Sequence, residues 1–167
     1  MSDSSTSTIP PPTKATTHGG KYLTFALGKE EYGLQILKVR EIIGLMDITA
    51  VPRTLPHVRG VINLRGQVIT VVDLRAKFDM QSVEKTDQTC IIVVEINQSG
   101  RKLNIGIIVD RVSEVLDIAA EKIEASPNLG GSGDADFILG MGKIGDSVKI
   151  LLDIDQVLST DDLSIAA

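Results

Sequence analysis

The sequence predicts a mainly β protein made of two packed, five-stranded SH3-like β-barrels with short helices. Of its 167 residues 43% are hydrophobic, but there is no tryptophan and only 3% are aromatic. Aliphatic side chains must therefore fill the core, and strands rich in valine, isoleucine and leucine suit them. Several strands are apolar on both faces, as at 68–72 and 105–109. Such strands need cover on both sides, which a second small barrel would supply.

An internal duplication relates residues 21–80 to residues 89–159. Early in each half, four residues recur at an offset of 106 − 33 = 73: Gly33, Val39, Glu41 and Ile42 match Gly106, Val112, Glu114 and Val115. Later, six residues recur at an offset of 140 − 60 = 80: Gly60, Val68, Val71, Val72, Asp73 and Leu74 match Gly140, Val148, Leu151, Leu152, Asp153 and Ile154. The larger second offset indicates a longer loop in the second half. Two pseudo-repeats of one structural unit explain this pattern.

The first pseudo-repeat starts with three strands, because β-branched and aromatic residues are separated there by turn residues. These strands are expected at 22–27, 32–36 and 39–43. A loop marked by Pro52 and Pro56 comes next. The polar stretch 81–88 is then expected to link the two pseudo-repeats.

The stretch 58–75 has the clearest hairpin pattern in the chain. Two β-rich arms flank a polar tip, in which Gly66 can adopt the positive φ of a short loop. The tip carries Arg65, and we expect the turn to hold this charge away from its own barrel. Asp73 ends the second arm, where its side chain can cap a short helix over 74–78.

The second pseudo-repeat shows the same order of elements. Strands are expected at 90–96, 102–109 and 112–116. A loop containing Pro127 leads to a hairpin over 137–152, which ends in a short helix capped by Asp153 or Asp155.

Both ends of the chain are expected to be flexible. Residues 1–20 are rich in Ser, Thr and Pro and have almost no apolar content. They cannot bury enough surface to offset the entropy of ordering, so we expect a disordered, dispensable tail. Order is expected to begin near Lys21, and 160–167 are expected to form a flexible C-terminal tail.

The composition argues against several functions. A net charge of −5 does not suit nucleic-acid binding, which needs a basic face. The single cysteine, Cys90, lies in an apolar run, where a buried and unreactive thiol is expected. His18 and His57 have no second ligand at metal spacing. No apolar run reaches the roughly 18 residues of a membrane span and no signal-peptide core is present, so a soluble, intracellular protein is predicted.

Two possible catalytic or cofactor patterns are better explained by structure. Residues 140–145 spell G-x-G-x-x-G, but a strand pattern follows where a dinucleotide site needs a helix. Glu41 and Glu114 hold equivalent positions in the duplication, which favours a repeated structural role over acid–base chemistry. The sequence therefore predicts no catalytic residues, no cofactor and no metal.

Charge is divided unevenly between the two pseudo-repeats. From residue 36 to 79 there are seven Lys or Arg against four Asp or Glu, and from residue 89 to the end six against thirteen. This asymmetry suits a protein with two different partners, although a solvated surface with no partner can look the same.

Residues 60–75 follow the pattern G-V-x-N-L-R-G-x-V-x-x-V-V-D-L-R. This pattern closely resembles the CheW family of bacterial chemotaxis coupling proteins. The resemblance covers roughly residues 22–158 and includes three more motifs: E-Y-G at 31–33, I-L-K-V-x-E-I at 36–42 and G-I-x-V-D at 106–110. One departure is Thr70, where the family usually has proline, so the edge geometry of that arm is expected to differ.

The resemblance implies two intertwined SH3-like barrels and no catalysis. Proteins of this family bridge the cytoplasmic tips of transmembrane chemoreceptors to the regulatory domain of the histidine kinase CheA, and they help to assemble receptor arrays. It therefore implies a cytoplasmic adaptor that is recruited to membrane arrays without inserting into the membrane. Two alternatives are a regulatory module of a CheA-like kinase and a coupling protein of a related pathway, such as surface motility.

The resemblance also implies two sets of contact residues. Val39, Glu41 and Arg65 match positions that bind the helical hairpin of the receptor. Glu124, Asn128 and Leu129 fall in a region used for kinase or ring contacts, although Glu124 replaces a residue that is basic in some relatives. The alternative for Glu41 and Arg65 is an intramolecular ion pair, a common arrangement of surface charges.

Overall fold

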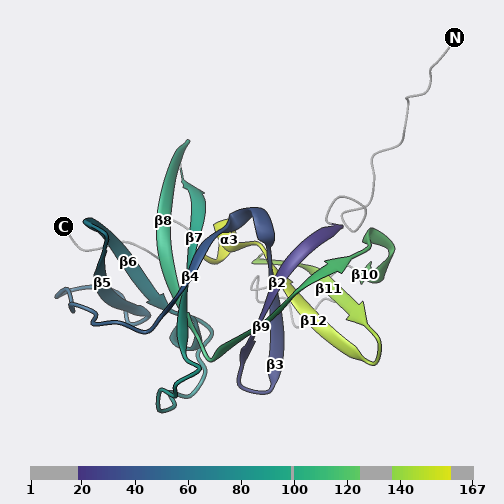
Figure 1. Cartoon of the computed structure of the whole chain (residues 1–167), viewed down its shortest axis with the longest axis horizontal. Helices are drawn as coiled ribbons and strands as arrows, with labels where there is room; N and C mark the ends of the chain where they lie inside the picture. Colours follow the sequence, from purple (N-terminus) through teal and green to yellow (C-terminus); the bar gives the residue numbers. More distant parts are fainter. Residues whose placement is uncertain (1–18, 99, 125–136, 159–167) are drawn as a thin grey trace, which may run out of the picture.

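The structure is a computed structural model that describes residues 19–98, 100–124 and 137–158. The strands form two sheets, and the helices are all short, so the predicted mainly β fold is confirmed. Figure 1 shows the sheets next to each other along the long axis of the molecule, with β5 and β6 at one end and β11 and β12 at the other. The tails at 1–18 and 159–167, and the loop at 125–136, lie outside the described residues.

The first sheet has six strands. In spatial order they are β10 (Ile123–Glu124), β11 (Ile138–Ile144), β12 (Ser147–Leu152), β3 (Glu30–Gln35), β2 (Gly20–Leu27) and β9 (Arg111–Ile118). The strand β10 has only two residues and adds one strand to the five predicted. Its counterpart in the other sheet is an isolated bridge between Thr49 and Val61.

The second sheet has five strands. In spatial order they are β4 (Val39–Gly44), β7 (Cys90–Gln98), β8 (Arg101–Val109), β6 (Gln67–Asp73) and β5 (Val58–Leu64). Two 3₁₀-helices, Ile36–Lys38 and Ala120–Lys122, and the α-helices α2 (Leu74–Lys77) and α3 (Ile154–Val157) complete the described elements. Thr70 lies on β6, which is paired with both β5 and β8. This arm was expected at an edge of the sheet, but it lies inside the sheet.

Each sheet combines strands of both pseudo-repeats. The hairpin of β2 and β3 joins β9, β11 and β12 of the second half, and the hairpin of β7 and β8 joins β4, β5 and β6 of the first half. Each exchanged hairpin forms one parallel pair with the other half, β3 with β12 and β8 with β6, and one antiparallel pair, β2 with β9 and β7 with β4. The intertwined arrangement is therefore confirmed, and neither half forms a barrel alone. Both edges of each exchanged hairpin find partners only because the other half supplies the strands.

Two equivalent glycines lie where the halves interlock. A Cβ atom on Gly33 would lie 2.8 Å from Cδ2 of Leu151, and one on Gly106 would lie 2.8 Å from Cγ2 of Ile91. Cβ contacts this short essentially do not occur, so any larger residue at either position would force the neighbouring methyl group to move. The offset of 73 therefore corresponds to a shared packing requirement as well as to a shared sequence pattern.

Among the described residues, the core consists of three clusters of buried, mainly aliphatic side chains. One belongs to the second sheet and is centred on Ile62, Ile69, Val71, Ile91, Val93 and Ile108. Another belongs to the first sheet and is centred on Tyr22, Ile118, Ile123 and Leu151. The largest takes residues from both sheets and both helices, including Phe25, Leu34, Leu74, Ile92, Ile107 and Leu158. Two barrel interiors and one layer between the barrels account for these clusters, and for strands that are apolar on both faces.

The two α-helices begin as the sequence predicts. Asp73 accepts a hydrogen bond from the backbone N–H of Arg75 at 3.0 Å, and Asp153 accepts one from Asp155 at 3.2 Å. Each cap satisfies a backbone donor of the first helical turn. The two caps occupy equivalent positions, one after the last strand of each half, so they place α2 and α3 against the layer between the barrels.

A partly buried ion pair links the two barrels on one side. Arg75 of α2 binds Asp110 in a bidentate manner, with Nε and Nη2 at 2.8 and 2.6 Å from the two carboxylate oxygens. Asp110 lies between β8 and β9 and also accepts a hydrogen bond from the backbone N–H of Gly28 at 2.8 Å. The guanidinium group and this N–H hold the pKa of Asp110 below its ordinary value.

The other side of the interface has the opposite arrangement of charge. Asp155 of α3 takes the position that is equivalent to Arg75. It binds Nζ of Lys38 at 2.7 Å and the backbone N–H of Asn97 at 2.9 Å. Both halves of the duplication therefore have an ion pair that links the barrels. The helix carries the base in the first half, Arg75, and the acid in the second half, Asp155.

We expect the replacement of Arg75 by methionine to lower the free energy of unfolding by roughly 2 kcal/mol at neutral pH, because Asp110 would lose its charged partner. The pKa of Asp110 is lower in the folded state than its unfolded value of about 3.9. The stability that the ion pair contributes is therefore fully present above the unfolded pKa and is lost as the pH falls through the folded pKa of Asp110. Urea unfolding at several pH values between about 6 and 3 measures this, and the variant should lose less stability than the wild type.

The matched control is Arg101→Met, because this exposed arginine forms no ion pair with another described residue. Equal pH profiles for Arg75→Met and the wild type would show that the pair contributes nothing to the link between the barrels.

Candidate functional site

The predicted hairpin turn is confirmed and has just two residues. β5 and β6 pair up to Leu64 and Gln67, which leaves Arg65 and Gly66 as the loop. Both have positive φ, 51° for Arg65 and 89° for Gly66, as in the type I′ turns that fit the twist of a hairpin. The side chain of Asn63 accepts a hydrogen bond from the N–H of Gly66 at 2.8 Å. The sequence indicated the positive φ of Gly66 but not that of Arg65.

Arg65 was expected to point away from its own barrel. Instead, it binds Glu41 on β4. Both Nη atoms take part: one lies 3.2 Å from Oε2 of Glu41, and the other binds Oε1. β4 and β5 are the two edge strands of the second sheet. The sheet curls far enough for its edges to meet, so a charge at the hairpin tip reaches the opposite edge. The intramolecular ion pair considered above is therefore present.

The pair nevertheless remains accessible. The side chain of Arg65 is 69% exposed and that of Glu41 is 32% exposed. The hydrogen bonds between them lower the pKa of Glu41 and raise that of Arg65, so both groups stay charged at neutral pH. An exposed ion pair of this kind adds little to stability.

Two exposed apolar side chains follow the two charged residues in the chain. Ile42, next to Glu41, is 45% exposed, and Val68, just after the turn, is 72% exposed. We call Glu41, Arg65 and Val68 the Arg65 surface. Ile42 is not part of it, because Ile42 pairs with Ile92 of the layer between the barrels and so points to the opposite face of β4 from Glu41. Reasoning from sequence placed Val68 in a strand covered on both faces. The sequence signal for the exposure of Val68 was its position beside the turn, where the other barrel does not cover it.

Val39 lies on the same strand but faces another part of the protein. A β-bulge separates it from Glu41, since Val39 pairs with Val94 whereas Glu41 pairs with Val93. Val39 packs against the layer between the barrels, whereas Ile43 packs inside the second barrel. Of the three predicted receptor contacts, the structure therefore brings only Glu41 and Arg65 together.

The residues expected to contact the kinase are on the other sheet. Glu124 of β10 is exposed and binds Nζ of Lys143 at 2.6 Å. Asn128 and Leu129 lie outside the described residues.

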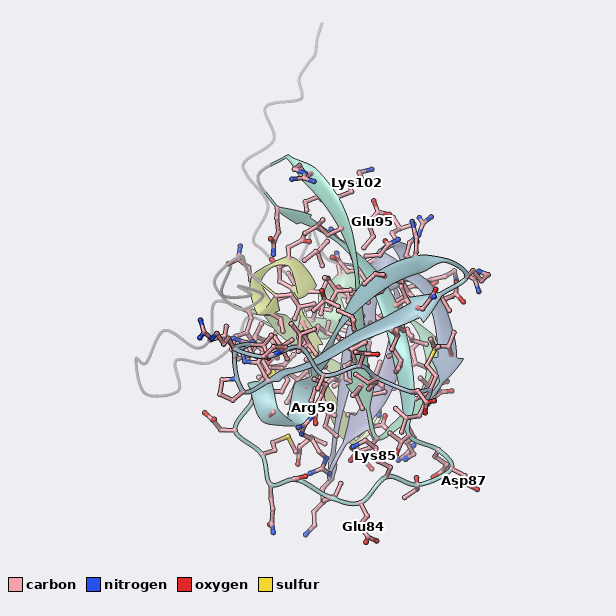
Figure 2. All side chains as sticks on the ribbon, turned by 90° about the vertical axis from the view of Figure 1, so that its left-hand side faces the viewer. Arg59, Glu84, Lys85, Asp87, Glu95 and Lys102 are labelled. Carbon is pink, nitrogen blue, oxygen red and sulfur yellow. The ribbon has the colours of Figure 1, made fainter. Side chains whose placement is uncertain are left out.

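The other charges on the second sheet are separate from the Arg65 surface. Arg40 and Lys102 both bind Glu95, with shortest distances of 3.1 and 3.5 Å. Figure 2 shows Glu95 and Lys102 towards the tip of the β7–β8 hairpin, far from the loop at the opposite end of the molecule that carries Glu84, Lys85 and Asp87. That loop is the polar linker expected between the pseudo-repeats.

The motifs considered for catalysis have structural places. The glycines of 140–145 belong to β11 and its turn, and β12 follows, so the hairpin interpretation is confirmed. Glu41 and Glu114 lie on different sheets and cannot act as a carboxylate pair. Cys90 is partly buried rather than fully buried, and this burial raises the pKa of its thiol.

The described residues contain neither a cluster of metal ligands nor a helix that could cross a membrane. Within 19–98, 100–124 and 137–158 there is no group of three His, Cys, Asp or Glu side chains that could hold a metal ion. In the same part of the chain no helix is long and apolar enough to cross a membrane.

Comparison with known proteins supports the resemblance found in the motifs. The family model described as CheW-like domain matches residues 21–162. The chain is 38% identical over 149 residues to Chemotaxis protein CheW of Klebsiella aerogenes, covering 89% of this chain and 87% of the relative. It is 32% identical over 154 residues to Chemotaxis protein CheW of Rhizobium meliloti, covering 92% and 97%.

A solved structure gives the same result for the fold. The crystal structure of the scaffolding protein TtCheW from Thermoanaerobacter tengcongensis matches with a TM-score of 0.77 at 33% identity, covering 89% of this chain and 98% of that one. The family and the chemotaxis role that the motifs predicted are therefore confirmed. The chain belongs to the CheW-like family.

Proposed function

We propose that this protein is a non-catalytic adaptor that couples chemoreceptors to a histidine kinase. It binds the helical hairpin at the cytoplasmic tip of the receptor and the regulatory domain of the kinase. It acts in the cytoplasm, where receptor arrays recruit it to the membrane. The observation that carries this proposal is the Arg65 surface, in which an exposed ion pair at a hairpin tip is followed in the chain by the exposed side chain of Val68.

The chemistry of this surface suits an amphipathic helix. Val68 can receive an apolar residue of the helix, whose apolar stripe repeats every three or four residues. Arg65 can bind an acidic side chain of the helix with the part of its guanidinium group that remains exposed, while Glu41 holds it in place. Val39 supports β4 from the layer between the barrels, so its role in binding is indirect.

The backbone at Arg65 also favours a role in recognition. A positive φ is uncommon for residues other than glycine and has an energetic cost. The equivalent turn of the other sheet has Gly145 at this position, with a φ of 58°. The fold therefore accepts glycine here, and the arginine is best explained by what its side chain binds.

The second partner requires a separate surface. Glu124 is an exposed residue of the first sheet, whereas Arg65 belongs to the second. We assign the kinase to the region of Glu124, Asn128 and Leu129, which leaves the Arg65 surface free for a receptor. An adaptor with this arrangement can hold both partners at the same time.

Reconstitution tests this proposal. Purified protein, kinase and a membrane-bound receptor fragment are mixed, and kinase autophosphorylation is measured with labelled ATP. We expect the rate to rise by about tenfold or more only when all three are present, which corresponds to an ordinary coupling free energy. Failure of the three proteins to sediment together with the membranes would contradict the proposal. Activation by receptors of a motility pathway alone would favour that alternative.

A further inference from the structure

A cavity of about 290 Å³ lies at the edge of the layer between the barrels, and we call it the Phe78 pocket. Five half-buried apolar side chains supply its walls: Tyr32 of β3, Phe78, Phe137, Ile138 of β11 and Ile150 of β12. All five pack against the core cluster that both barrels share. Two charged residues, Lys77 and Asp79, complete the described lining. An apolar cavity of about 150 Å³ can hold benzene, so this one has room for a two-ring group such as indole.

Three of the walls belong to a ladder of stacked aromatic rings. Phe25, which is fully buried, stacks on Tyr32 with ring centroids 5.8 Å apart. Phe78 stacks on Tyr32 at 5.8 Å, and Phe137 stacks on Phe78 at 5.3 Å. The ladder therefore leads from the core to the pocket and joins the two pseudo-repeats. Aromatic rings attract one another beyond the burial of their area, so these walls favour an aromatic occupant over an aliphatic one.

The end of α2 holds Phe78 and Asp79 in place. The N–H of Met80 donates a hydrogen bond to the carbonyl of Arg75 at 2.7 Å, and the N–H of Asp79 donates one to the carbonyl of Ala76 at 3.1 Å. Asp79 has a φ of 58°. These are the features of a Schellman motif, in which the residue with positive φ is usually glycine. This wall of the pocket is therefore fixed by the backbone, and a carboxylate stands where glycine is usual.

The duplication shows the same place in a closed form on the other side of the layer. Ile105 pairs with Thr70 across β8 and β6, as Tyr32 pairs with Ile150 across β3 and β12. By the offset of 80, three buried aliphatic residues stand where the pocket has Ile138, Lys77 and Phe78: Val58, Val157 and Leu158. Ile105 is buried as well. The fold can therefore close this place with aliphatic side chains, and the open, aromatic version is best explained by what it binds.

We propose that the Phe78 pocket binds the aromatic side chain of a protein partner that carries an arginine or a lysine next to that residue. The ring enters the pocket, and the basic group binds the carboxylate of Asp79. This carboxylate is exposed and forms no ion pair within the described part of the chain. Charge complementarity therefore selects a base over an acid beside the ring.

The partial exposure of the walls indicates the source of the ring. Binding sites for small molecules bury roughly 70–90% of the ligand, whereas protein interfaces are commonly anchored by one aromatic side chain in a pocket. Half-buried walls suit a ring that remains attached to the surface of a partner. The proposal does not depend on which partner binds the Arg65 surface.

Tryptophan fluorescence tests this proposal, because the protein has no tryptophan of its own. Two capped peptides, Ser-Trp-Arg-Ser and Ser-Trp-Glu-Ser, are each titrated with the full-length protein. We expect the emission of the Trp-Arg peptide to shift to the blue as its indole leaves water, with a dissociation constant of about 1 mM because the ligand is small. The Trp-Glu peptide should bind about fivefold more weakly. A Leu-Arg peptide should compete with about fivefold lower affinity, since it cannot stack on the aromatic walls.

Two variants locate the binding site. Asp79→Asn should abolish the preference for the Trp-Arg peptide, and asparagine tolerates the positive φ at this position. Asp146→Asn is the matched control, because it removes the same charge from an exposed residue in the turn between β11 and β12. Ile138→Phe should abolish the blue shift, because the larger side chain fills the cavity. Circular dichroism checks its fold, and Asp79→Asn decides the question if Ile138→Phe does not fold.

Four results would overturn the proposal. Absence of a blue shift with both peptides would show that the pocket does not accept an aromatic side chain. Equal binding of the two peptides would show that Asp79 selects no base, and unchanged binding to folded Ile138→Phe would place the ring elsewhere. Free indole that binds as tightly as the Trp-Arg peptide would identify a small aromatic molecule as the occupant instead of a protein segment.

Discussion

Replacing Arg65 by glutamate is expected to abolish activation of the kinase by receptors while leaving the fold intact. The change puts two carboxylates together at Glu41 and reverses the field that an acidic receptor side chain meets, and repulsion of this kind typically costs several kcal/mol in binding. The thermal midpoint should shift by only about 2 °C, because Arg65 is exposed and its ion pair contributes little to stability. Receptor-dependent autophosphorylation and circular dichroism measure the two effects. Direct binding to the kinase should persist, because we place the kinase near Glu124.

A charge swap separates recognition from the ion pair itself. The double variant Arg65→Glu with Glu41→Arg can restore an intramolecular pair with its charges exchanged. If a receptor binds the arginine at position 65 itself, the swap should not restore activation of the kinase by the receptor. Full recovery would mean that the pair only supports the barrel. Arg101→Glu, at an exposed position in another hairpin, is the control for a general effect of charge.

Replacing Gly60 by alanine is expected to lower the free energy of unfolding by more than about 3 kcal/mol, corresponding to a thermal midpoint roughly 10 °C lower. Gly60 has a φ of 141°, and a Cβ atom there would lie 2.0 Å from the carbonyl oxygen of Thr49. That oxygen accepts a hydrogen bond from the N–H of Val61 at 2.9 Å, so it cannot move away without breaking the bridge between the loop and β5. Chemical unfolding followed by circular dichroism measures the loss.

Gly44→Ala is the matched control for the Gly60 variant. Gly44 also lies on a strand of the second sheet, but a Cβ atom there would have no neighbour within 4 Å. Its replacement should change the free energy of unfolding by less than about 0.5 kcal/mol. Equal stability of the two variants would show that the contact with Thr49 relaxes at no cost.

Local and repeated features of this protein could be recognised in the sequence because they depend on residues close together in the chain. The turn at Gly66 follows from the freedom of glycine to adopt positive φ, and the caps at Asp73 and Asp153 follow from the unpaired N–H groups of a helix start. The two offsets revealed the duplication, since the same packing requires the same residues, as at Gly33 and Gly106. The family followed from many fixed spacings that agree at once.

The tertiary structure decided which distant elements meet. No local pattern indicates that the hairpin of β2 and β3 belongs to the sheet of β12, because the parallel pairing joins residues far apart in the chain. The curl of the second sheet brings Arg65 to Glu41, so the charge that seemed free of its own barrel is bound to it. Exposure was decided in the same way. Val68 and Val148 are apolar residues of buried-looking strands, yet they lie outside the cover that each barrel gives the other, because that cover ends before the hairpin tips.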